Sequence, residues 1–251
     1  MAGNRESVAT SRTPQLLKSF DRSADVVQGF VARAHGVGFA EMLRTEVRDE
    51  YESLIPQVSL IESPIGFALN SFLTITAQEI AVYKVMKRHG KTAEEAWEIC
   101  HAALRLRMAR YSRLRRWLMG RLMSSRLVLR RMRKQAESEA SRTMGGFEVR
   151  YVIGDGTEYD WGVDYVRCAN YQLVVDQGAA EFAPYVCMSD IALGDAMGWG
   201  LIRTHTIADG CDSCDFRFKK GVKTQISSMT QAVQETIQRI AEKETSGEDW
   251  S

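Results

Sequence analysis

Thiols, acids and an arginine crowd into one short stretch of the chain, residues 210–218, which read Gly-Cys-Asp-Ser-Cys-Asp-Phe-Arg-Phe. The chain has five cysteines. Four of them fall in the same C-terminal region: Cys168, Cys187, Cys211 and Cys214. Cysteine thiolates act in proteins as nucleophiles and as metal ligands. This clustering therefore predicts thiolate catalysis or a metal site rather than cysteines that serve only in packing.

Cys168 and Cys187 are the two candidate nucleophiles. Cys168 lies between a predicted strand, residues 161–166, and a predicted helix that begins at residue 169. The positive end of a helix dipole lowers the pKa of a thiol at the helix N-terminus, which favours the nucleophilic thiolate. Cys187 precedes Asp190 by three residues, a spacing that puts a thiol and a carboxylate on one helix face. The structural alternatives are a small buried side chain for Cys168 and a helix N-cap for Asp190.

Cys211 and Cys214 have the Cys-x-x-Cys spacing of a metal or redox pair. Zinc takes four ligands, and the two upstream cysteines could complete the set. However, a zinc ribbon uses two closely spaced pairs, and a thioredoxin-type pair opens a helix, whereas this pair opens a predicted strand, residues 214–219. On that strand Cys214 shares a face with Phe216 and Phe218, so it also fits a position in the core.

Polar side chains on two predicted strands fit substrate recognition. Arg203 can bind a carboxylate through two parallel hydrogen bonds, and the hydroxyl of Thr206 can orient a polar ring. His205 between them is either a general base or a structural histidine. Asp215 and Arg217 share one face of their strand. They form either an ion pair that stabilises the strand or a carboxylate and a guanidinium that together bind a zwitterionic substrate.

Residues 99–136 are rich in Arg and Lys and contain no acid. Such a run would suit a nucleic acid or an anionic membrane. Leucines repeat at helical spacing through the same run, however, and the net charge of the whole chain is only +1. We therefore expect helices that pack within the protein or contact another subunit. This predicts no nucleic-acid partner, no membrane partner and, at most, a homo-oligomer formed through the helical half.

The elements that must position these residues divide the chain into four parts. We expect a disordered terminus at 1–13, a helical region at 14–143, an α/β catalytic region at 144–243 and a polar tail at 244–251. In the helical region, His89-Gly90 marks a helix end, Thr92 an N-cap, and Gly120 a break. The predicted fold class is α+β, with the helical N-terminal half packed on a small α/β unit that has a mainly antiparallel sheet.

Apolar residues in the C-terminal half alternate in some segments and recur at helical spacing in others. The expected order is strand 147–153, strand 161–166, helix 169–177, helix 179–187, strand 201–208, strand 214–219 and helix 222–243. The 251 residues are 45% hydrophobic and 26% charged, as in ordinary globular proteins. No apolar run reaches the ~18 residues that cross a bilayer, and the N-terminal residues are too polar for a secretion signal. We therefore expect a cytoplasmic protein with free thiols.

The ordered set of cysteines, acids and arginines resembles the L-2-amino-thiazoline-4-carboxylic acid hydrolase family over about residues 145–221. The residues that carry the resemblance are Cys168, Glu181, Cys187, Asp190, Arg203, Thr206, Ile207, Ala208, Gly210, Cys214, Asp215, Phe216, Arg217 and Phe218. The family name implies hydrolytic opening of a C–N bond in a cyclic amidine, giving an N-carbamoyl amino acid. Cys211 and His205 are not part of the family pattern, which argues against schemes built on a Cys-x-x-Cys zinc pair or on a histidine base.

The resemblance implies a hydrolase for a small cyclic amidine or amide-like substrate that needs no cofactor. Its site would comprise the catalytic residues Cys168, Cys187, Asp190, Cys214 and Asp215, and the substrate-binding residues Arg203, Thr206 and Arg217. Either of the first two cysteines would attack as a thiolate, either aspartate would move protons, and either arginine would bind a substrate carboxylate. Two alternatives stay open: a zinc hydrolase with Cys168, Cys187 and Cys214 as ligands, and a non-catalytic relative that only binds a small molecule.

Overall fold

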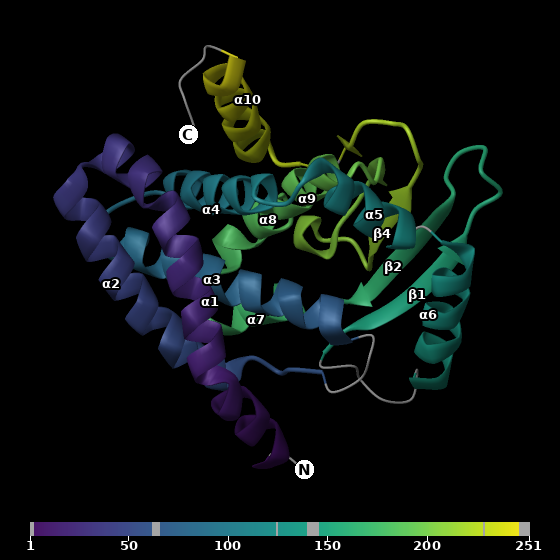
Figure 1. Cartoon of the computed structure of the whole chain (residues 1–251), viewed down its shortest axis with the longest axis horizontal. Coiled ribbons are helices and arrows are strands. Elements are labelled where there is room, and N and C mark those ends of the chain that lie inside the picture. Colours follow the sequence, from purple (N-terminus) through teal and green to yellow (C-terminus); the bar gives the residue numbers. More distant parts are fainter. Residues whose placement is uncertain (1–2, 62–65, 124, 140–145, 228, 246–251) are drawn as a thin grey trace.

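The computed structural model describes residues 3–61, 66–123, 125–139, 146–227 and 229–245. Within these ranges, helices make up the N-terminal part, and a five-stranded sheet with further helices makes up the C-terminal part (Figure 1). The predicted α+β class is therefore confirmed. None of the described helices is long and apolar enough to cross a membrane.

Long helices with short connections build the N-terminal part. They are α1 (Gly3–His35), α2 (Val37–Leu54), the short 3-10 helix η1 (Ile55–Gln57), α3 (Gly66–Arg88), α4 (Ala93–Ala109), α5 (Arg113–Met123) and α6 (Arg126–Glu139). Helix α1 packs against α2 and α4, and α3 packs against α2 and α4. Thr92 is the N-cap of α4, as the sequence predicts, and it forms a reciprocal capping box with Glu95. Gly90 follows α3 with a φ of 71°, a conformation that suits glycine at a helix end.

Two expectations for the helical region differ from the structure. Residues 3–13 belong to α1 rather than to a disordered terminus, because extending an existing helix adds a hydrogen bond for each residue ordered. Gly120 lies inside α5 rather than at a break. A Cβ at this glycine would come within 2.8 Å of the carbonyl oxygen of Met197, so the missing side chain lets α5 pack closely on α9 (Ser189–Met197). The predicted boundary at 143 and the tail from 246 lie outside the described residues.

The sheet has the strand order β1-β2-β4-β3-β5. Its strands are β1 (Glu148–Ile153), β2 (Trp161–Arg167), β3 (Leu201–Arg203), β4 (Cys214–Phe218) and β5 (Gln225–Ile226). All neighbouring strands run antiparallel except β3 and β5, which are parallel. Trp161 on β2 stands opposite Phe218 on β4, and their rings stack with centroids 4.0 Å apart. Such cross-strand aromatic pairs hold the register of the central strands.

Short helices connect the strands and cover the sheet. They are α7 (Ala169–Asp176), the 3-10 helix η2 (Ala180–Phe182), α8 (Ala183–Val186), α9 and the 3-10 helix η3 (Ile207–Asp209). The last helix, α10 (Gln231–Thr245), follows the sheet and packs against α4. The predicted strand 201–208 is wrong beyond Arg203, because side-chain hydrogen bonds fix residues 204–209 in a loop and η3. The predicted helix 222–243 is wrong before Gln231, since Gln225–Ile226 instead pairs with β3.

One hydrophobic core joins the two parts of the chain. It includes helix residues such as Tyr51 and Ile80 together with Phe147, Phe182 and Leu201 from the C-terminal part. Helix α3 packs against α7, and α4 packs against α8 and α9. Figure 1 shows α7 and α8 between the long N-terminal helices and the strands. This arrangement places the loops that carry the candidate site residues in the middle of the molecule.

Candidate functional site

A cavity of about 140 Å³ lies between the sheet and helices α3, α7, α8 and α9. Aromatic and aliphatic side chains form most of its wall, among them Phe72, Trp161 and Phe218. Polar and titratable side chains from separate segments also line it: Thr76, Glu79, Tyr165, Cys168, Asn170, Cys187, Ser189, Asp190, Arg203 and Cys214. An enclosed, mainly apolar pocket with a few convergent polar groups is the usual form of a small-molecule site.

Five of the predicted site residues line this cavity, and three do not. The lining residues are Cys168, Cys187, Asp190, Arg203 and Cys214. The others, Thr206, Asp215 and Arg217, make contacts elsewhere. The alternation along β4 explains the positions of Asp215 and Arg217, because Cys214, Phe216 and Phe218 face the cavity and the two residues between them face the other side. Thr206 precedes η3 and caps it.

Arg203 is fully buried and connects two of the other site residues. Its Nη1 donates to the carboxylate of Asp190 at 2.6 Å and to the backbone carbonyl of Cys187 at 2.8 Å. Its guanidinium carbon lies 5.5 Å from the centre of the Phe216 ring. Its Nε and Nη2 are buried and have no hydrogen-bond partner among the described residues. These two N–H groups form the side of a guanidinium that binds a carboxylate with two parallel bonds.

Two carboxyl groups in the cavity have raised pKa values. Burial raises the pKa of Asp190 to about 6, although Arg203 beside it favours the ionised form. Burial raises the pKa of Glu79 further, to about 8, since its partner is only the hydroxyl of Ser189, which donates to Oε1 at 2.6 Å. The negative charge of Asp190 adds to this effect. At neutral pH, Asp190 is therefore mostly ionised and Glu79 mostly protonated.

Glu79 was missed by reasoning from the sequence. It lies on α3, and its Oε2 is buried without a hydrogen-bond partner among the described residues. The signal available in the sequence was an acid inside the apolar run Ile75–Val82, at a position that a core-facing helix normally gives to a hydrophobic residue. A buried carboxyl with a shifted pKa in a cavity is a characteristic feature of functional sites.

The three thiols of the cavity are held in their protonated form. Burial raises the pKa of Cys187 well above its usual value and that of Cys214 to about 12. Cys168 is the N-cap residue of α7, and we expected a lowered pKa there. Burial instead raises the pKa of Cys168, although the backbone N–H groups of Tyr171 and Asn170 oppose the rise. Desolvation thus outweighs the helix N-terminus at this position.

Zinc ligation is the alternative role of the cysteines. All five cysteines are free thiols. Cys100 is buried in α4 and Cys211 is exposed, and neither lines the cavity. Across the described residues, no group of three or more His, Cys, Asp or Glu side chains is arranged to hold a metal ion.

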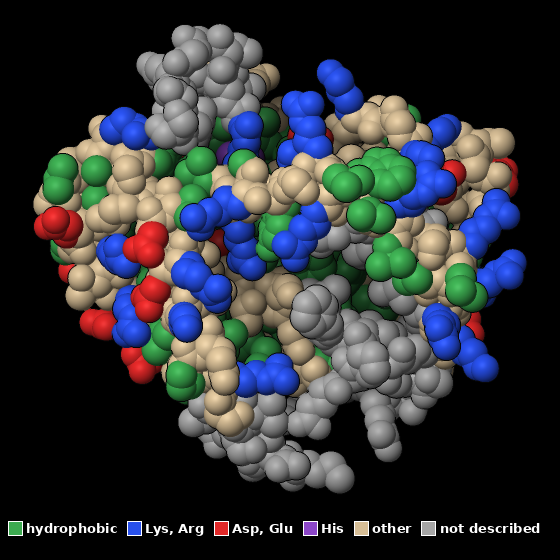
Figure 2. Space-filling view, in the orientation of Figure 1, with side chains coloured by type: hydrophobic (Ala, Val, Ile, Leu, Met, Phe, Trp, Pro, Cys, Tyr) green, Lys and Arg blue, Asp and Glu red, His purple; other side chains and the backbone are tan. Residues whose placement is uncertain are grey.

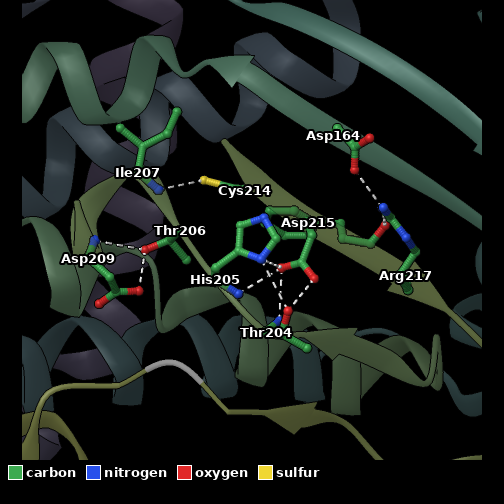
Figure 3. Close-up of polar contacts among 10 residues, drawn as sticks. Asp164, Thr204, His205, Thr206, Ile207, Asp209, Cys214, Asp215 and Arg217 are labelled. Atoms are coloured by element: carbon green, nitrogen blue, oxygen red, sulfur yellow. Dashed lines mark hydrogen bonds and ion pairs between the residues drawn. The ribbon is translucent and has the colours of Figure 1, made fainter. Parts of the chain in front are cut away.

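Asp215 binds the loop that follows β3 (Figure 3). Its carboxylate accepts hydrogen bonds from the backbone N–H groups of Thr204 and His205, each at 2.8 Å, and from the Thr204 hydroxyl at 2.6 Å. Burial opposes ionisation of Asp215, but these hydrogen bonds outweigh it and lower the pKa of the carboxyl. The geometry makes Asp215 an anchor for the segment that carries Arg203.

Thr206 and Arg217 also have local partners. The Thr206 hydroxyl donates to the Asp209 carboxylate at 2.6 Å and accepts the Asp209 backbone N–H at 3.2 Å, which caps η3. Arg217 Nη1 donates to Asp164 on β2 at 2.6 Å, and Figure 3 shows the side chain directed toward Asp164 and away from Asp215. The ion pair on this face therefore joins two strands instead of two residues of one strand.

The comparisons with known proteins identify a family for this chain. The family described as L-2-amino-thiazoline-4-carboxylic acid hydrolase matches residues 72–218, which is more than half of the chain. The matched span includes Glu79, Asp190, Arg203 and the three cysteines of the cavity. The comparisons found no matching curated protein and no matching solved structure. Because the match covers the cavity and most of the elements that form it, the chain belongs to the L-2-amino-thiazoline-4-carboxylic acid hydrolase family.

Proposed function

We propose that this hydrolase-family chain opens a small cyclic amidine that carries a carboxylate, by attack of the Cys168 thiolate on the amidine carbon. The observation that carries the proposal is the buried guanidinium of Arg203, whose Nε and Nη2 have no partner among the described residues, in the cavity that the thiols line. Leaving two buried N–H groups unpaired is costly, and a substrate carboxylate would pair both. The volume of about 140 Å³ suits a single small ring, since a cavity of roughly 150 Å³ can hold benzene.

Cys168 is the preferred nucleophile of the three thiols. It is the N-cap residue of α7, and two backbone N–H groups favour its thiolate. Cys187 and Cys214 are harder to ionise, because burial raises the pKa of Cys187 well above its usual value and that of Cys214 to about 12. A thiol with a raised pKa still needs a base at the moment of attack. Asp190 has the charge for this role, and its carboxylate is close enough to Cys168 to act on the pKa of the thiol.

The two carboxyls divide the proton transfers between them. Asp190, with a pKa of about 6, takes the proton of Cys168 as the sulfur bonds to the amidine carbon. Glu79, with a pKa of about 8, donates its proton to the leaving atom as the ring bond breaks. Water then attacks the same carbon and gives its proton to Glu79, and Asp190 returns a proton to the sulfur as the carbon–sulfur bond to Cys168 breaks. Paired groups with separated pKa values are well suited to such alternation.

The product identifies which ring bond breaks. The amidine carbon of an aminothiazoline bonds to the ring sulfur and to two nitrogens. An N-carbamoyl product keeps the ring nitrogen on that carbon, so it requires cleavage of the ring C–S bond and releases a thiol. Cleavage of the ring C–N bond, which we expected from the sequence, would instead release an amine. Mass spectrometry together with thiol and amine assays distinguishes these outcomes.

The test is turnover of L-2-amino-thiazoline-4-carboxylate by the purified chain and by two matched cysteine variants. Cys168→Ser is expected to lower kcat by at least roughly three orders of magnitude, because a hydroxyl is a far weaker nucleophile. Cys211→Ser is the control, since Cys211 is exposed and does not line the cavity, and it should keep full activity. Equal activity of the two variants would refute thiolate catalysis by Cys168. Saturable binding without turnover would show a non-catalytic relative.

A further inference from the structure

Helices α5 and α6 expose most of the large hydrophobic side chains that are exposed in the described part of the chain. On α5, Leu114 is 65% exposed, Trp117 54%, Leu118 53% and Leu122 64%. On α6, Leu127 is 71% exposed. Figure 2 shows green patches of hydrophobic side chains over this region of the surface. A cluster of exposed leucines with a tryptophan is unusual for a free surface and marks a contact site.

The exposed side chains of α5 form one stripe along the helix. Positions 114, 117, 118 and 122 are spaced by three or four residues, so they share a face. The opposite side of α5 packs on α9, where Gly120 meets the Met197 carbonyl. Leucines at helical spacing in residues 99–136 thus divide into two groups. Leu104 and Leu129 are buried in the protein, whereas the α5 stripe is left without a covering element among the described residues.

Basic side chains surround this stripe. The exposed arginines on the two helices include Arg113, Arg115, Arg121, Arg126, Arg130 and Arg131. The guanidinium of Arg121 lies 5.3 Å from the centre of the Trp117 ring. Figure 2 shows Lys and Arg around the hydrophobic patches, while acidic side chains are more frequent at the other end of the molecule, over α1 and α2. The near-zero net charge of the chain therefore does not describe the surface of α5 and α6, where exposed arginines predominate.

We propose that the α5–α6 face, defined by Leu114, Trp117, Leu118, Leu122, Leu127 and the arginines around them, binds the surface of an anionic lipid bilayer. The leucines and the tryptophan enter the boundary between headgroups and acyl chains, and the arginines contact lipid phosphates. This replaces our expectation that the chain has no membrane partner.

Other occupants fit the face less well. A second copy of the chain in a two-fold dimer would place this basic surface against itself, which is repulsive. A nucleic acid would use the arginines but would leave the leucine stripe in water. An anionic bilayer uses both features at once, because its surface is negatively charged and its interior is apolar.

The test is co-sedimentation of the full chain with vesicles of phosphatidylcholine alone or mixed with phosphatidylglycerol. Binding is expected only to the anionic vesicles, and it should weaken as salt rises because screening reduces the attraction. The double variant Leu118→Gln, Leu122→Gln should raise the apparent Kd by about tenfold, since two apolar side chains are lost from the contact. Val37→Gln, which alters another exposed hydrophobic residue on α2, is the matched control and should bind like the wild type.

Three results would overturn this proposal. The first is an absence of binding to anionic vesicles at low salt. The second is vesicle binding that the leucine variant does not weaken. Binding would then rest on electrostatic attraction alone, without insertion of the leucines. The third is a concentration-dependent dimer or a tight duplex RNA complex that the same leucine variant abolishes, since either would assign the stripe to another partner. Circular dichroism and melting curves of the variants show that they are folded.

Discussion

Two carboxyl groups in one cavity differ because their immediate partners differ. Asp190 has a guanidinium at 2.6 Å, whereas Glu79 has only the Ser189 hydroxyl at the same distance. Burial raises both pKa values, but only Asp190 gains a positive charge that offsets part of the rise. The result is a base and an acid at neutral pH, built from the same chemical group by a change of one neighbour.

Glu79→Gln should show this difference in stability as well as in rate. The pKa of Glu79 in the folded chain, about 8, lies above the ordinary value of 4.5, so the folded state binds the proton more tightly. Its contribution to stability is therefore complete below about pH 4.5 and is lost as the pH rises toward 8. Glutamine keeps an acceptor for Ser189 and does not titrate. The variant should be more stable than the wild type at pH 8 by about 2–4 kcal/mol. The difference between the two proteins should be smaller at pH 5.

Urea unfolding at the two pH values measures this effect, and Glu158→Gln, a substitution of an exposed acid, serves as the matched control. The same Glu79→Gln protein should lose most of its kcat, because the leaving atom has no proton donor. It should also lose the decrease in wild-type activity that we expect above about pH 8. A variant that keeps normal activity with the wild-type pH profile would remove Glu79 from the mechanism.

At the scale of elements, β4 separates two functions by alternation. Cys214, Phe216 and Phe218 contribute to the cavity wall. Asp215 and Arg217 face the other side, where Asp215 holds the loop after β3 and Arg217 pairs with Asp164 on β2. One strand thus carries both the wall of the cavity and the hydrogen bonds that keep Arg203 in place.

Asp215→Asn should destabilise the fold more than Arg217→Lys. Asp215 is 8% exposed, and its charge accepts three hydrogen bonds, so its loss should cost about 1–3 kcal/mol. The Arg217–Asp164 pair is partly exposed, and lysine keeps the charge, so the second change should cost less than about 1 kcal/mol. Thermal melting at pH 7 compares the stability of the two variants.

The pKa of Asp215 is lowered, so the contribution of its carboxylate to stability is lost as the pH falls below 3.8. The difference in stability between the two variants should therefore shrink in acid. A larger loss for Arg217→Lys would contradict this assignment.

At the scale of the molecule, the helical part and the sheet part share one core and should unfold together. Phe182 from η2 is fully buried and stacks on Tyr83 of α3, with ring centroids 4.7 Å apart. Glu181 beside it accepts hydrogen bonds from the Tyr83 hydroxyl and from Lys87. Contacts of this kind tie the region before residue 140 to the region after it.

Phe182→Ala should therefore lower the unfolding free energy of both parts at once. The loss expected for such a buried aromatic is about 3–5 kcal/mol. Far-UV circular dichroism follows the helices, and near-UV dichroism follows the packing of aromatic side chains in both parts, such as Trp97 in α4 and Trp161 in β2. Both signals should shift by the same amount and remain coincident, as in one cooperative transition. Two separated transitions would show that the parts are independent domains.

The sequence by itself determined most of the local elements and indicated five of the residues that line the cavity. The capping box at Thr92, the strands around Trp161 and Cys214, and the helix after Cys168 all follow from residues within a few positions of one another. The family pattern predicted Cys168, Cys187, Asp190, Arg203 and Cys214, which the fold brings to one cavity. Local patterns work for these features because helix and strand periodicity depend on near neighbours.

Only the tertiary structure decided which side chains of the site are buried, which partners they have and which way they face. Glu79 enters the cavity because Ser189, 110 residues away, meets it across the core. Asp215 and Arg217 leave the cavity because β4 pairs with β2 in a register that puts them on the other face. The pKa of Cys168 rises instead of falling, since desolvation by distant segments outweighs the nearby helix end. The leucines of α5 remain exposed because its other side packs on α9. Each outcome depends on contacts between residues far apart in the chain, and no local pattern encodes them.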